Sequence, residues 1–252
     1  MASIPSASPR RIYPRPPIVE AIVEFHYQSD VSDERVLTSL KNSLGDSYKG
    51  EPKKQNRLQF AALVNGDTVQ SSTTTLPHFT FLKTPDGLRQ VGTGPGVLSV
   101  HVLAPYPGWE RFLEQAQAAV SALPEEVRSG SITALAVRYI DRIVLPDGDV
   151  QRFLTVMPSR PSTMPTELAA FHVAIETKEP ADGTSAVLTI ASATPEPDGR
   201  PALIYDLNLH RVGERLCGFS ADSWGPIAED LHRRQREIFE GSITDQMREL
   251  FQ

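Results

Sequence analysis

The chain has 252 residues, of which 40% are hydrophobic and 22% are charged, and its formal net charge is −6 from 25 Lys and Arg against 31 Asp and Glu. These values are typical of a soluble globular protein with one large domain or two small ones. The acidic balance argues against a general nucleic-acid-binding protein, which would have a basic surface, although it leaves room for a small basic patch.

The sequence also indicates a compartment. No apolar run approaches the roughly 20 residues that span a bilayer, so we expect no membrane segment. The first residues, "MASIPSASPRR", lack the apolar stretch of a secretory signal, and we expect residues 1–12 to form a disordered tail. Cys217 is the single cysteine, so we expect a buried structural thiol and a cytoplasmic location.

The first predicted element is a strand over residues 18–28, because every second residue in this stretch is apolar. Glu20, Glu24 and His26 then share its other face. Pro16 and Pro17 stand directly before it, which predicts a strand at a sheet edge or beside a cleft.

A helix is predicted next, over residues 32–45. Ser32 is a suitable N-cap, acidic residues follow in the first turn, and Gly45 can end the helix. Further strands are predicted at 57–64, 78–84, 88–94 and 96–103, and the turn sequence "PDG" makes a hairpin of the second and third.

The second half of the chain repeats this outline. A helix is predicted at 109–123, a long strand at 131–146, a Pro/Ser/Thr-rich loop at 157–167, and a meander at 171–178, 185–192 and 202–212. A helix capped by Asp222 or Ser223 should run to Phe239, and Ser242 with Asp245 should start another as a capping box.

This order predicts an α+β fold in which two similar strand-helix-meander units form a mainly antiparallel sheet with a C-terminal helix. We expect a single domain over residues 13–252, with pseudo-repeated halves at 13–95 and 96–252 that share a sheet or abut. We also expect a core that includes the following residues: Val19, Val23, Phe25, Trp109, Phe112, Val137, Tyr139, Leu203, Tyr205, Ile238 and Phe239.

Three segments resemble a known family. "PPIVEAIVEFHY" at 16–27 is similar to the opening of a sporadically distributed bacterial family of about this length and of unknown function, whose members begin with Pro-Pro-Ile-x-Glu-Ala. "VRYIDRIVLP" at 137–146 resembles a second block of that family, and "LHRRQREIFEGSIT" at 231–244 resembles a third. Asp141 stands where the family usually has Asn.

The resemblance implies a prokaryotic, cytoplasmic protein. The patchy occurrence of the family implies mobile or defence-related genes. The resemblance supplies no catalytic residues.

Candidate site residues lie on the polar faces of the predicted strands. Arg138 and Arg142 have the same four-residue spacing as Glu20 and Glu24, so pairing of the two strands would allow two ion pairs to form together. One hypothesis is a structural ladder of these pairs on a wet sheet face, and the other is a polar cleft in which the arginines hold an anion. Asp206 and His210 share a face of a third strand, and the full set of candidate binding residues is Glu20, Glu24, His26, Arg138, Arg142, Asp206 and His210.

The sequence contains no P-loop, no nucleophile elbow and no paired zinc-binding histidines. We therefore expect no cofactor, no metal and no catalytic residue. The first hypothesis for function is a non-catalytic binding or interaction protein, such as an accessory of a defence or toxin–antitoxin-like system, whose partner is another protein or a small anionic ligand. The alternative is an enzyme that acts on an anionic or phosphorylated substrate in a polar sheet cleft.

Overall fold

The protein is described by a computed structural model that covers residues 11–50, 52–55, 58–65, 68–75, 79–157, 161, 163–164 and 169–252. Most of the expected N-terminal tail and part of the expected 157–167 loop lie outside these residues.

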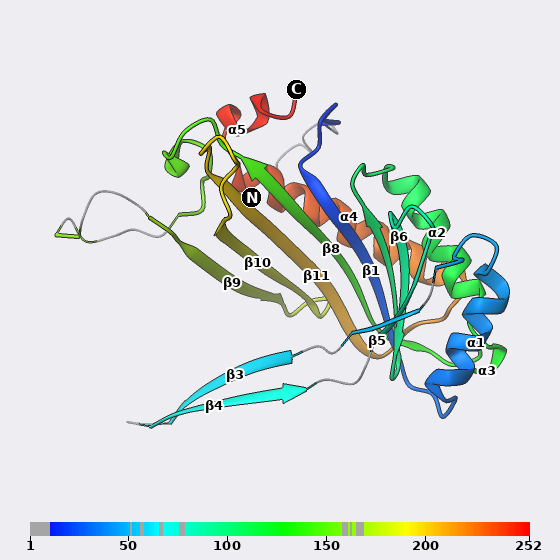
Figure 1. The fold of residues 1–252 in the computed structure, drawn as a ribbon. Coiled ribbons are helices and arrows are strands. Elements are labelled where there is room, and N and C mark those ends of the chain that lie inside the picture. Colours follow the sequence, from blue (N-terminus) through cyan, green and yellow to red (C-terminus); the bar gives the residue numbers. More distant parts are fainter. Residues whose placement is uncertain are drawn as a thin grey trace, which may run out of the picture.

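One antiparallel sheet of nine strands forms the centre of the molecule (Figure 1). The fold is thus α+β with an antiparallel sheet, as predicted, while the division at residue 95 stays a prediction. The strands follow one another across the sheet as β2 (Lys53–Gln55), β5 (Phe79–Lys83), β6 (Arg89–Gly94), β7 (Val97–Leu103), β1 (Ile18–Tyr27), β8 (Ile132–Val144), β11 (Ala202–Cys217), β10 (Thr184–Ala193) and β9 (His172–Glu179). A separate hairpin consists of β3 (Leu58–Asn65) and β4 (Thr68–Thr75).

The position of β1 corrects one of the two alternatives predicted for it, that of a strand at a sheet edge. β1 lies in the middle of the sheet, where it pairs with β7 on one side and β8 on the other. Its two prolines precede the hydrogen-bonded ladder and cost it no donor, and the carbonyl of Pro17 still accepts a hydrogen bond from the backbone N–H of Arg142 at 3.0 Å. A central strand preceded by prolines is therefore compatible with full pairing on both sides.

Helices pack against one face of this sheet. α4 (Ala221–Ser242) crosses behind β8 and β1, and α1 (Asp33–Leu44) and α2 (Trp109–Ser121) lie toward the β6 and β7 side (Figure 1). Two short helices complete the set, α3 (Glu125–Arg128) and α5 (Asp245–Glu249), together with a 3-10 turn at Val150–Arg152. No helix among the described segments combines the length and the apolar character needed to cross a membrane.

The predicted helix signals are largely confirmed. Ser32 caps α1 by accepting a hydrogen bond from the N–H of Arg35. The last helices differ from prediction, because α4 begins after Ser220 and continues through Ser242, and Thr244 caps α5. Ser242 is unavailable as a cap since its hydroxyl donates to the Ile238 carbonyl at 2.7 Å and accepts from Tyr205.

The core lies between the sheet and these helices. Most of the predicted core residues are buried there, namely Val23, Phe25, Trp109, Phe112, Val137, Tyr139, Leu203 and Tyr205. Val19 is half-buried, and Ile238 and Phe239 are partly buried against the core rather than inside it. Cys217 is also half-buried, and burial raises the pKa of its thiol to about 11, which disfavours the reactive thiolate.

Deleting residues 243–252 should strongly destabilise the protein. Ile243, Met247 and Phe251 are at most 3% exposed, and Thr244 donates a backbone hydrogen bond to Phe153. The deletion would uncover the apolar surface beneath these side chains, so we expect a lower melting temperature and lower solubility. Deletion of residues 1–10, which are polar and unpatterned, is the control and should leave melting unchanged. Equal melting of the two truncated proteins would contradict this prediction.

Candidate ligand-binding face of the sheet

The candidate site lies on the face of the nine-stranded sheet opposite the helices, which we call the open face. In β1, Ala21, Val23 and Phe25 point into the core, so the alternating residues Glu20 and Glu24 point to the open face. The same alternation places the other predicted residues there: His26 on β1, Arg138 and Arg142 on β8, and Asp206 and His210 on β11. All seven candidates therefore share one surface.

The expected pairing of β1 with β8 is confirmed, but the predicted ion-pair ladder is wrong. Arg138 lies opposite Ile22 on β1 and opposite Asn208 on β11. Its guanidinium donates to Asp206 through two bonds, Nε to Oδ1 at 2.8 Å and Nη2 to Oδ2 at 2.5 Å. The planar fork of Arg matches a carboxylate in this bidentate geometry.

Arg142 also takes a different partner. Its guanidinium pairs with Glu196 and donates to the carbonyl of Thr194 at 2.9 Å, in the segment between β10 and β11. Arg142 therefore links β8 to the segment between β10 and β11, and it lies apart from the cavities described below.

The glutamates of β1 still act on Arg138 electrostatically. The hydrogen bonding that Arg138 donates to Asp206 is the main cause of the raised pKa of Arg138, and the charges of Asp206, Glu20 and Glu24 add to it against the effect of burial. Arg138 thus stays a cation at the centre of an acidic neighbourhood.

Glu20 is instead hydrogen-bonded to His101, a residue that sequence reasoning did not select. His101 Nδ1 lies 2.8 Å from Glu20 Oε1, and the side chain of His101 is only 5% exposed. The His101 hydrogen bond is the main reason why the pKa of Glu20 is lowered. Because the ionised carboxylate can only accept, Nδ1 carries a proton, and Nε2 is buried without a partner in the described part of the chain.

One signal in the sequence could have found His101. Ser99 and His101 are two residues apart in the otherwise apolar stretch "VLSVHVL", which is the spacing of one strand face. Glu24 and His26 have the same spacing on β1, and there His26 Nε2 lies 2.8 Å from Glu24 Oε1. Polar pairs with this spacing mark the open face on both strands.

Strand register aligns these side chains in a row across the sheet. Successive Cα partners are Lys83, Gln90, His101, Ile22, Arg138 and Asn208, which come from β5, β6, β7, β1, β8 and β11. With Glu20 and Glu24 on either side of Ile22 along β1, the row forms a polar track that runs perpendicular to the strands.

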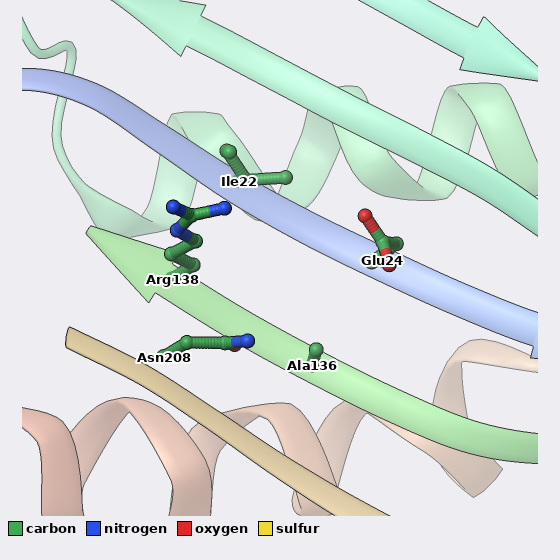
Figure 2. A pocket seen from close by; sticks show the side chains of 5 residues that line it. All are labelled: Ile22, Glu24, Ala136, Arg138 and Asn208. Carbon is green, nitrogen blue, oxygen red and sulfur yellow. The ribbon is translucent and has the colours of Figure 1, made fainter. Parts of the chain in front are cut away.

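Two cavities lie along this track and meet at Ile22 and Arg138. The smaller has a volume of ≈ 120 Å³ and is also lined by Glu24, Ala136 and Asn208 (Figure 2). The larger has a volume of ≈ 330 Å³ and extends past Glu20 and His101 to Lys83 and Gln90.

The remaining candidates surround these cavities rather than line them. Asp206 holds Arg138 in place, His26 contacts Glu24, and His210 lies further along β11. Within the described ranges, no three His, Cys, Asp or Glu side chains are grouped so that they could hold a metal ion.

Asp141 lies on the opposite, helix-covered face of β8. It is 3% exposed and Oδ1 has no hydrogen-bond partner within the described residues. Burial, with a smaller effect of the Asp206 charge, raises the pKa of this carboxyl to about 8. A protonated Asp141 offers one donor and one acceptor oxygen.

No family model, no curated protein and no solved structure shows a significant match to this chain. The resemblance noted in the sequence therefore stays a prediction.

Proposed function

We propose that the protein is a non-catalytic binding protein that takes a small polar ligand on the open face, centred on Arg138. The observation that carries this proposal is the pair of adjoining cavities, two of whose lining residues have a buried polar atom without a protein partner. His101 Nε2 and Asn208 Oδ1 are both buried and unpaired in the described part of the structure. A buried polar atom without a partner costs ~1–3 kcal/mol, and a ligand that reorders these side chains could recover this energy.

The arrangement of charges supports ligand binding without catalysis. Arg138 is fixed by its two bonds to Asp206, which gives a rigid recognition group at the junction of the cavities. The sequence resemblance alone supports an accessory role in a prokaryotic defence or toxin–antitoxin-like system.

One contact favours the alternative of an enzyme that acts on an anionic substrate. The Glu20 carboxylate fixes the Nδ1–H tautomer of His101, a residue that lines the larger cavity, and in that tautomer Nε2 carries no proton. A general base is often built in this way.

The test is mass spectrometry of small molecules released from protein that was purified from its host under native conditions. Wild-type protein should release a defined molecule, and Arg138→Gln should release at least about tenfold less, since a charged hydrogen bond is worth ~1.5–3 kcal/mol. Arg142→Gln is the matched control, because Arg142 is on the same strand face but outside both cavities.

Because Arg138→Gln leaves Asp206 without its partner, the double variant Arg138→Gln/Asp206→Asn checks that any loss does not come from misfolding. Equal release by wild-type protein and by both Arg138 variants would contradict the proposal. Conversion of the released molecule by wild-type protein, but not by His101→Gln, would favour the enzyme instead.

A further inference from the structure

The two cavities differ in charge. Lys83 and Arg138 face one carboxylate, Glu20, in the larger cavity. The guanidinium of Arg138 is already bonded to Asp206 and the carboxylate of Glu20 to His101, whereas the ammonium group of Lys83 makes no ion pair or hydrogen bond within the described structure. The ammonium group of Lys83 is therefore a cation without a direct partner among the described residues, which favours an anionic group beside it at this end of the track.

The smaller cavity has the opposite character. Its ionised lining groups are Glu24 and Arg138, and the fork of Arg138 is turned to Asp206 outside the cavity. Asn208 adds a carboxamide that can accept a hydrogen bond (Figure 2). This end favours a cationic or hydrogen-bond-donating group.

An apolar side chain lies between the two ends of the polar track. Ile22 belongs to both cavities, is 6% exposed, and lies between His101 and Arg138 in the row of Cα partners. Lys83 and Arg138 are four strands apart, which is roughly 19 Å at the usual spacing between strands. A ligand that contacts both ends is therefore elongated and has an apolar middle that rests on Ile22.

We infer that the ligand is an elongated zwitterion, with a carboxylate or phosphate group at Lys83, an aliphatic middle over Ile22 and an ammonium group at Glu24 and Asn208. This inference rests on the proposed binding function and names the ligand class for the same site.

The test uses a length series of unbranched ω-amino carboxylates as probes, with the unbranched monocarboxylates of the same lengths as matched controls. Binding to the full-length protein is measured by isothermal titration calorimetry. We expect one length of ω-amino carboxylate to bind at least about tenfold more tightly than its monocarboxylate, because the added ammonium group forms charge-assisted hydrogen bonds. The corresponding ω-amino phosphonates show whether the anionic end prefers a carboxylate or a phosphate-like group.

Two variants test which group of the ligand is bound at each end of the track. Lys83→Met should lower the affinity for both carboxylate series about tenfold, and Glu24→Gln should remove only the preference for the amino group. Arg142→Gln should change neither affinity.

Equal affinities of the two series, an amino preference that survives Glu24→Gln, or no binding of any probe would overturn the zwitterion inference. The proposed binding function would still be judged separately, by whether a molecule released from the native protein depends on Arg138.

Discussion

At pH 7, the Asp141→Asn variant should have a free energy of unfolding about 4 kcal/mol higher than that of the wild type, once the difference between the two proteins in acid has been subtracted. The wild-type carboxyl is fully buried in the core face of β8, and burial raises its pKa from 3.8 to about 8. In the unfolded chain the same carboxyl ionises freely, so ionisation stabilises the unfolded state over this range. Asn removes that titration while it keeps a polar side chain of similar size.

The sign of the pH dependence follows from the raised pKa. Below pH 3.8 the Asp141 side chain is neutral in both states, and the wild-type protein has its full stability. This stability is lost as the pH rises toward about 8, and above that pH the loss is constant. Denaturant unfolding across this range should therefore show a difference between Asp141→Asn and wild type that grows with pH. The growth of the difference isolates the titration, because any packing effect of the amide is present at every pH.

Asp149→Asn is the matched control, since Asp149 is an exposed carboxyl shortly after the same strand. The difference in free energy of unfolding between Asp149→Asn and wild type should stay small across the same pH range. A difference for Asp141→Asn that did not change with pH would refute the assignment of a buried, protonated carboxyl.

Phe25→Ala should destabilise the protein by ~3–5 kcal/mol, the cost of truncating a buried aromatic residue. Phe25 is 0% exposed, and its ring meets Trp224 of α4 edge to face with centroids 5.1 Å apart. The loss combines the missing apolar contacts with a cavity between β1 and α4, which a central strand paired on both sides cannot close easily.

Thermal and denaturant unfolding measure this effect. Val212→Ala, at a valine that is 53% exposed, is the control and should change stability by less than about 0.5 kcal/mol. Wild-type stability for Phe25→Ala would show that this strand does not face the core.

Local patterns predicted individual elements well. The alternation in residues 18–28 placed Phe25 in the core and Glu20 on the opposite face, and Ser32 was correctly predicted to cap α1. These features depend on residues a few positions apart, whose relative directions are set by the period of a strand or a helix.

The partners of the site residues were not predictable in this way. Arg138 and Glu24 are on neighbouring strands as expected, yet Arg138 binds Asp206, which is 68 positions away in the chain. The choice among several acids depends on the register of three strands, and no local pattern fixes that register.

The sequence by itself therefore determined the α+β class, the strand faces and the concentration of polar residues on one surface. Only the tertiary structure decided that β1 lies at the centre of the sheet, that His101 joins Glu20, and that Asp141 is buried among the helices. The physical reason is range: side-chain direction follows from the local backbone period, whereas strand order, ion-pair choice and the burial of a charge follow from contacts between segments that are distant in the chain.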